Sequence, residues 1–268
     1  MIEWRYGDQL DWRLALIGLT ESSEQYAQRG YTPLRGALGQ LSFRRYGMPF
    51  SPAPKARLSA TARACRAVVA ARIEEPGSEW PVFRAIQLAN FTTPFVIEDD
   101  AQLGDVLTRW AGVDGKLVVS RLDDSDVSEA YERDKVESRA AAGSAAELQG
   151  KAAATDGPVR FTAPSIVFNS NGTSLVAGGF QPVEAYDVLV CNLDPTLHRE
   201  SPPDTPMPLL EHFKGGLTTQ EVAALMTSGN DAPDRRGAEA ALIELVASGQ
   251  ARRESLGDDA LWKSAQAA

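Results

Sequence analysis

The chain has 268 residues, 43% of them hydrophobic and 24% charged, which is typical of an ordinary globular protein with room for two domains. Its net charge of −9 argues against electrostatic binding to nucleic acid or to anionic lipid. No apolar stretch reaches the roughly 18 residues that a membrane span needs. We therefore expect a cytoplasmic protein that has neither a nucleic-acid partner nor a membrane partner.

Two cysteines and two histidines leave little material for metal binding or nucleophilic catalysis. Cys65 lies in an alanine-rich helical pattern and Cys191 in a predicted helix over Val183–Leu193, so we expect both thiols to be buried, reduced, unpaired and slow to react. His198 and His212 lie in or beside a proline-rich stretch. They predict neither a zinc site nor a Ser-His-Asp triad, and no metal or catalytic residue is assigned.

The first half of the chain predicts one strand, a long loop and a helical region. Met1–Asp8 is typical of the end of a helix, and Leu10–Leu19 alternates and then becomes continuously apolar, which predicts a strand. Glycines and prolines interrupt Thr20–Pro54, which predicts a loop. A helical insertion is expected over about residues 55–150, with helices at Ser59–Ile73, Ser78–Ala89, Asp100–Trp110 and Val127–Ala142.

A second group of elements follows this insertion. Arg160–Phe168 contains an X-Pro step that opens a short apolar strand, an uncommon place for proline because proline cannot donate a ladder hydrogen bond. Asn171-Gly172 is a hairpin turn pair. A second strand over Ser174–Phe180 and a helix entered through Gln181-Pro182 complete the group.

The C-terminal part is expected to form a separate domain. Five prolines in Asp194–Pro208 predict a semi-rigid linker, so the domains are expected at 1–193 and 209–268, with 194–208 between them. Thr218 and Glu221 form a capping-box pattern at a helix start. A second helix from Pro233 and a hairpin over residues 251–262 complete a small winged-helix-like α+β arrangement.

This C-terminal part is acidic, which argues against DNA as its partner. From Pro206 onward it has six Lys/Arg against nine Asp/Glu. With so few net phosphate contacts, the counterion-release contribution to DNA binding would be close to nothing. We expect it instead to pack on the rest of the chain or on another copy, through the apolar side chains of Leu209, Leu210, Phe213 and Trp262.

The order of strand, helical insertion, X-Pro strand, hairpin and a helix beginning Gly179-Phe180-Gln181-Pro182 resembles the second half of a thioredoxin fold of the DsbA-like family. The resemblance spans roughly Trp4 to Leu193 and implies an α/β, thioredoxin-like fold with an inserted helical domain. It also implies a cis bond between Ala163 and Pro164. Substrate binding is implied for the residues around that bond: Thr162, Ala163, Pro164 and Ser165.

In the DsbA-like family the cis-proline lies against a Cys-x-x-Cys pair, and this sequence contains no such pair. We therefore expect Met1 to be an internal residue of a longer reading frame, which supplies the opening strand followed by Cys-Pro-x-x or Ser-Pro-x-x. The resemblance implies a thiol–disulfide oxidoreductase family member, acting on a protein or a small thiol, that is inactive over this chain alone.

Two alternatives stay open. Isomerases of 2-hydroxychromene-2-carboxylate and kappa-class glutathione transferases are similar overall, but use a serine in place of the first cysteine and bind glutathione. No cofactor is otherwise expected. The other alternative is a non-enzymatic scaffold, and a homo-oligomer is compatible with each of these readings.

Overall fold

The computed structural model describes residues 1–51, 53–154 and 157–266, so residue 52 of the predicted loop lies outside the described part. It is a mixed structure, 49% helical and 11% strand, with small sheets. Nowhere in these ranges is a helix both long and apolar enough to cross a bilayer.

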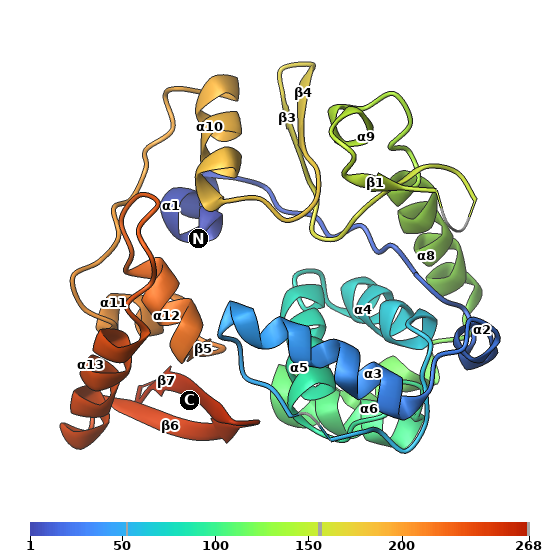
Figure 1. The fold of residues 1–268 in the computed structure, drawn as a ribbon, viewed down its shortest axis with the longest axis horizontal. Coiled ribbons are helices and arrows are strands. Elements are labelled where there is room, and N and C mark those ends of the chain that lie inside the picture. Colours follow the sequence, from blue (N-terminus) through green and yellow to red (C-terminus); the bar gives the residue numbers. More distant parts are fainter. Residues whose placement is uncertain (52, 155–156, 267–268) are drawn as a thin grey trace. The chain divides into compact units, whose positions relative to one another are not determined.

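The chain forms two compact units. Figure 1 shows the helices and strands of the chain, coloured by residue number. The first contains Met1–Ile17, Glu132–Pro203 and Thr227–Ala232. The second contains Gly18–Tyr131, Asp204–Met226 and the C-terminal part from Pro233 onward. The second unit thus combines the predicted helical region with most of the predicted C-terminal domain.

The first unit has short helices around a two-stranded hairpin. Its elements are α1 (Ile2–Tyr6), a 3-10 turn (Gly7–Gln9), the end of α8 (Ser125–Ser138), α9 (Ala145–Leu148), β1 (Ala152–Ala153), β2 (Arg160–Phe161), β3 (Ile166–Ser170), β4 (Thr173–Ala177) and α10 (Val183–Leu193). Helix α10 has the predicted bounds. β1 pairs with β2 and β3 with β4, both antiparallel.

The predicted turn pair closes the β3–β4 hairpin. Asn171 and Gly172 have φ values of 48° and 78°, the left-handed conformations that a two-residue turn needs between twisted strands. The register runs from Ser170 opposite Thr173 to Ile166 opposite Ala177. Because side chains alternate along a strand, this register turns Phe168 toward the core and leaves Val167 exposed.

The core of the first unit lies between this hairpin, α10 and α1 (Figure 1). Phe168 and Ala177 of the hairpin, Tyr186 and Val190 of α10, and Ile2 and Tyr6 of α1 form one buried cluster. The α10 residues in this list are four apart and therefore share one helical face. The apolar contact fixes α10 against the strand that follows Pro164.

The predicted strand over Leu10–Leu19 is wrong, since residues 11–20 have no regular secondary structure. The backbone groups of this stretch bind side chains instead of a neighbouring strand. The N–H of Leu16 donates to the Asp134 carboxylate at 3.2 Å, and the Arg139 guanidinium donates to the C=O of Ile17 at 2.7 Å. Apolar alternation is not sufficient for a strand, because a strand also requires the backbone of a neighbouring strand as its hydrogen-bond partner.

The N-terminal part of the second unit is helical. Its elements are α2 (Ser23–Gln28), α3 (Pro33–Gln40), a 3-10 helix (Leu41–Tyr46), α4 (Ala62–Glu74), α5 (Glu79–Thr92), α6 (Asp100–Val106) with a π-helical turn (Leu107–Ala111), α7 (Gly115–Ser120) and the start of α8. The four predicted helices are present with shifted ends. The sequence pattern missed α7.

The prediction of a loop over Thr20–Pro54 is wrong in part, because α2, α3 and the 3-10 helix lie within it. Thr32 caps α3 by accepting a hydrogen bond from the N–H of Arg35 at 3.1 Å, and Pro33 occupies the first helical position. Proline is tolerated there because that N–H has no helical partner. The prolines and glycines therefore limit the length of these helices without preventing them.

The C-terminal part holds α11 (Met207–His212), β5 (Leu217–Thr218), α12 (Thr219–Leu225), α13 (Arg235–Ala247), β6 (Ala251–Leu256) and β7 (Asp259–Ser264). The three strands form an antiparallel sheet in the order β5-β7-β6. The capping box of Thr218 and Glu221 is confirmed. Helix α13 begins two residues after Pro233, because the Asp234 side chain caps it by accepting from the N–H of Gly237.

Within the second unit this sheet and its helices bind the segment Gly47–Phe50. Arg235 donates to the C=O of Gly47 at 2.7 Å, and the N–H of Phe50 donates to the Asp258 carboxylate at 2.8 Å. Arg84 of α5 pairs with both carboxylate oxygens of Glu221 at 2.7 Å. Of the expected packing residues, Leu209, Leu210 and Trp262 are fully buried.

Candidate functional site

The four predicted site residues form the loop between β2 and β3. Ala163 and Pro164 are exposed, and Thr162 and Ser165 are half-buried. The peptide bond between Ala163 and Pro164 is cis, as the family resemblance implied. The structure therefore brings all four residues together at one end of the hairpin.

Side-chain hydrogen bonds hold this loop in place. The Ser165 hydroxyl donates to the C=O of Thr162 and accepts from the N–H of Gly179 at 3.0 Å. The Thr162 hydroxyl donates to the C=O of Lys151 at 2.7 Å. Since Gly179 follows β4, these bonds tie the two ends of the hairpin together and expose Ala163 and Pro164 between them.

The connection from β4 to α10 forms the neighbouring wall. Gly179 has a φ of +67°, and a Cβ on it would lie 3.3 Å from the Thr162 hydroxyl, so glycine suits this close approach. The Tyr186 hydroxyl donates to the C=O of Gly179 at 3.0 Å and accepts from the N–H of Gln181 at 3.1 Å. Burial raises the pKa of Tyr186, which keeps that hydroxyl a donor.

Phe180 is the residue of this wall that the sequence did not single out as a site residue. It is 66% exposed, although the residues on both sides of it are fixed by hydrogen bonds. An exposed phenylalanine in a fixed loop presents apolar surface without a large loss of chain entropy on binding. The pattern Gly-Phe-Gln-Pro marks the position, but exposure could not be read from it.

The loop and β3 also expose backbone hydrogen-bonding groups. Across the described ranges, the N–H and C=O of Ala163 take part in no hydrogen bond. Ser170 and Thr173 close the two-residue turn and form a hydrogen-bonded pair. Hydrogen-bonded and non-hydrogen-bonded pairs alternate along an antiparallel ladder, so the N–H and C=O groups of Val167 and Asn169 point away from β4. An extended chain lying along this edge would meet donors and acceptors at the usual spacing of a β-ladder.

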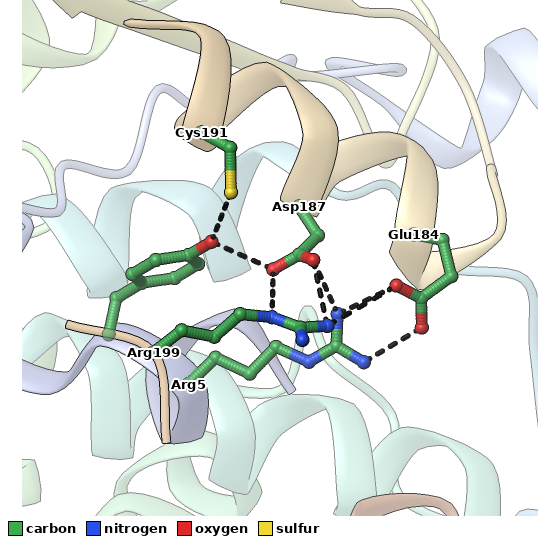
Figure 2. Close-up of polar contacts among 6 residues, drawn as sticks. Arg5, Glu184, Asp187, Cys191 and Arg199 are labelled. Carbon is green, nitrogen blue, oxygen red and sulfur yellow. Dashed lines mark hydrogen bonds and ion pairs between the residues drawn. The ribbon is translucent and has the colours of Figure 1, made fainter. Parts of the chain in front are cut away.

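The same unit contains a charged cluster, whose side chains come from α1, from α10 and from the segment that follows α10 (Figure 2). Arg5 donates to Glu184 at 2.8 Å and lies 3.2 Å from Asp187, while Arg199 donates to Asp187 at 3.0 Å. The Arg5 side chain is 4% exposed and that of Asp187 is 9% exposed. Two arginines and two carboxylates thus join α1, α10 and the segment that follows α10.

Tyr6 and Cys191 extend this cluster. The Tyr6 hydroxyl lies 2.8 Å from Asp187 Oδ1 and 3.2 Å from Cys191 Sγ. Burial raises the pKa of Tyr6, and the hydrogen bond to Asp187 adds to the rise. Burial opposes ionisation of Asp187, but hydrogen bonds from Tyr6 and Arg199 and the charges of both arginines outweigh it and lower the pKa of Asp187.

The hydrogen-bond directions of the cluster follow from these shifts. An ionised carboxylate only accepts, so Tyr6 gives its single proton to Asp187. The phenol oxygen is then an acceptor for the thiol proton of Cys191. The expected burial of Cys191 is wrong, since the residue is exposed, and Cys65 is half-buried. The helical pattern of α10 did not reveal which face of the helix is covered.

We expect Cys191 to react slowly with iodoacetamide in the native protein and several-fold faster in Tyr6→Phe. The Tyr6 hydroxyl lies 3.2 Å from Cys191 Sγ and holds the sulfur through a hydrogen bond, which the substitution removes. The measurement is the labelling rate at neutral pH by mass spectrometry, with Cys65 as the internal reference. Rapid labelling of Cys191 in the native protein, or an equal rate in both proteins, would contradict this role for Tyr6.

No group of three or more His, Cys, Asp or Glu side chains among the described residues is placed to hold a metal ion. The charged cluster joins α1 to α10 and to the segment that follows α10, with Cys191 at its edge. The exposed loop Thr162–Ser165, the unpaired edge of β3 and Phe180 form the candidate binding site.

Comparisons with known proteins do not assign this chain to a family. No protein-family model matches it, and no curated protein is similar to it at a significant level.

Proposed function

We propose that the first unit is the substrate-binding half of a DsbA-like thioredoxin domain, and that it binds an extended peptide along Thr162–Ser165 and β3. The chain is then a member of a thiol–disulfide oxidoreductase family. Over this chain the proposed activity is binding, since the sequence has no Cys-x-x-Cys pair.

The observation that carries the proposal is the free backbone of Ala163 beside the unpaired edge of β3. Main-chain groups in this position bind extended peptides by adding a strand to the sheet. The exposed side chains of Ala163, Pro164 and Phe180 supply apolar surface next to them. The order of hairpin and α10, joined through Phe168 and Tyr186, is the order that the family resemblance requires.

We also propose a winged-helix arrangement for the C-terminal part, without a role in DNA binding. The order α12, α13, β6, β7 supports it. Two arginines that could contact phosphates are already engaged: Arg235 pairs with Asp259 at 2.9 Å, and the guanidinium of Arg253 lies 5.6 Å from the centre of the Trp262 ring. This use of the basic residues favours packing within the protein.

We predict that Ala163→Pro weakens peptide binding about threefold to tenfold, the value of one hydrogen bond. Proline removes the N–H of residue 163 and keeps an apolar side chain. The probe is a fluorescein-labelled octapeptide of β-branched residues with a central S-methylcysteine, which cannot be oxidised to a disulfide. Binding is followed by fluorescence anisotropy, and the control Ala163→Ser retains the N–H.

The same titration separates the alternatives. Saturable peptide binding that falls in Ala163→Pro and persists in Ala163→Ser supports the proposal. Binding of S-methylglutathione without binding of the peptide would replace it with the glutathione-dependent isomerase or transferase. Failure of both ligands to bind would overturn the proposal in favour of a non-enzymatic scaffold.

A further inference from the structure

Large apolar side chains are exposed along the segment Tyr31–Met48 of the second unit. It comprises α3, the 3-10 helix after it and the residues on either side. Its exposed apolar residues are Tyr31, Leu34, Leu38, Leu41, Phe43, Tyr46 and Met48. Single exposed apolar residues are normal on a protein surface, whereas a contiguous group marks an interaction site.

The leucines of this segment form one ridge. Leu34, Leu38 and Leu41 are spaced by four and three residues, so they share one helical face. Leu34 and Leu38 are 59% and 58% exposed, whereas Ala37 of the same helix is buried. Helix α3 therefore rests on the protein through a small residue and turns its larger side chains to solvent.

The segment is fixed to the body of the second unit. The ring of Phe43 meets that of Phe91 on α5 edge to face, with centroids 6.0 Å apart. Arg44 pairs with Asp258 at 3.3 Å, and the C=O of Gly47 accepts from Arg235. A partner would therefore meet a surface that is already ordered, which lowers the entropy cost of binding.

Two arginines of this segment carry charge that no carboxylate of the described residues neutralises, although the chain as a whole is acidic. Of the nine Lys/Arg between Gln25 and Ile73, Arg44, Arg57 and Arg63 pair with carboxylates of other segments. Arg35 lies over the Tyr31 ring at 4.9 Å and Arg45 over the Tyr46 ring at 4.8 Å. Across the described ranges neither guanidinium pairs with a carboxylate, so both charges remain available to a partner.

We propose that the Tyr31–Met48 segment is a docking surface for an acidic amphipathic helix of a partner protein. Leucines at i, i+4 and i+7 match an apolar stripe of the same period on the partner. Arg35 and Arg45 at the margins of the ridge match Asp or Glu beside that stripe. This inference does not depend on the function proposed for the first unit.

Other occupants fit these observations less well. A second copy placed ridge to ridge would bring like charges together, at Arg35 and Arg45 of each copy. An anionic lipid surface would repel a chain of net charge −9, and α3 is held to the protein instead of being free to insert. Single-stranded nucleic acid stacks on exposed aromatic faces, and those of Tyr31 and Tyr46 are occupied by arginines.

The test uses a synthetic helical peptide with leucine at i, i+4, i+7 and i+11, glutamate at the flanking positions and a fluorescein label. Anisotropy is measured with the full chain at two salt concentrations. We expect saturable binding that weakens as salt rises. The double variant Leu34→Ser/Leu38→Ser is expected to weaken binding about tenfold to a hundredfold. Arg35→Glu/Arg45→Glu should reverse the salt dependence.

Matched controls make the result specific. Leu148→Ser removes a leucine that is 84% exposed in the first unit, and it should leave binding unchanged. A peptide of the same composition with the leucine spacing broken should bind at least tenfold more weakly. Because the substituted residues are exposed, each variant should keep its circular dichroism spectrum.

Several outcomes would overturn the proposal. They are no binding of the helical peptide, equal binding of the rearranged peptide, or binding that the leucine variant leaves unchanged. Tighter binding of phosphatidylserine vesicles or of a single-stranded oligonucleotide would assign the surface to lipid or to nucleic acid. Self-association of the native chain that the leucine variant abolishes would assign it to a second copy.

Discussion

Asp187→Ala is expected to lower the free energy of unfolding by about 3–5 kcal/mol, the cost of breaking a buried ion pair by removing one partner. Asp187 accepts hydrogen bonds from Tyr6 and Arg199 and pairs with Arg5. Without the Asp187 carboxylate, Glu184 is the acidic partner that the buried Arg5 keeps in the cluster. The Tyr6 hydroxyl loses the oxygen that accepts its proton. The measurement is urea denaturation followed by circular dichroism.

Two further variants show whether charge or packing is responsible. Asp187→Asn retains an oxygen that accepts hydrogen bonds and loses the charge. Its free energy of unfolding should therefore lie between those of the native protein and of Asp187→Ala. Glu200→Ala removes an exposed acid of the same unit and should change stability by less than about 0.5 kcal/mol. Equal stability of Asp187→Ala and Glu200→Ala would show that the cluster does not order α10.

The cluster also predicts how the stability depends on pH. The Arg5 hydrogen bond lowers the pKa of Glu184, and the hydrogen bonds and charges around Asp187 lower its pKa despite burial. A carboxylate with a lowered folded-state pKa contributes stability above its unfolded pKa of about 4, and this contribution is lost as pH falls through the folded-state pKa. The difference between native protein and Asp187→Ala should therefore be full at pH 7 and shrink below about pH 4.

Trp262→Ala is expected to lower the stability of the second unit by about 3–5 kcal/mol. The side chain is 1% exposed, and its indole N–H donates to the Thr219 hydroxyl at 2.9 Å. That hydroxyl in turn donates to Asp259 at 2.9 Å. The substitution leaves a large cavity in β7 and removes a hydrogen bond that joins the sheet to the start of α12.

Trp110→Ala provides the matched control. Because Trp110 is 40% exposed, this substitution should lower the stability much less than Trp262→Ala. Trp262→Phe keeps most of the apolar volume and should recover part of the loss. Far-ultraviolet circular dichroism reports unfolding without relying on the substituted indole. A loss in Trp262→Ala no larger than in Trp110→Ala would show that Trp262 is not the centre of this core.

Local signals in the sequence account for the elements that were predicted correctly. Asn171-Gly172 specifies a turn through its own backbone preference, and Thr218 with Glu221 specifies a helix start through bonds within one turn. Helix α10 has an apolar face whose period can be counted along the chain. Helices α4, α5, α6 and α8 were predicted for the same reason, with shifted ends, whereas α2, α3 and α7 were missed.

The errors arose where the structure depends on a distant partner. The apolar alternation of Leu10–Leu19 was taken as the sign of a strand, but the backbone of this stretch binds the side chains of Asp134 and Arg139 instead of a neighbouring strand. Cys191 lies on a helix with an apolar face, and its exposure depends on which side of α10 is covered by α1 and the β3–β4 hairpin. The pairing of Arg5 with Glu184 joins residues far apart in the chain, and no local pattern marks it.

The sequence by itself determined the hairpin after Pro164, the helix that covers it, the capped helix at Thr218 and the acidic charge of the chain, because each depends on neighbouring residues or on composition. The tertiary structure decided which backbone groups stay unpaired at Ala163, that Phe180 is exposed, and that Leu34 and Leu38 face solvent. Exposure is a property of what covers a side chain. It is therefore fixed only when segments distant in sequence come together.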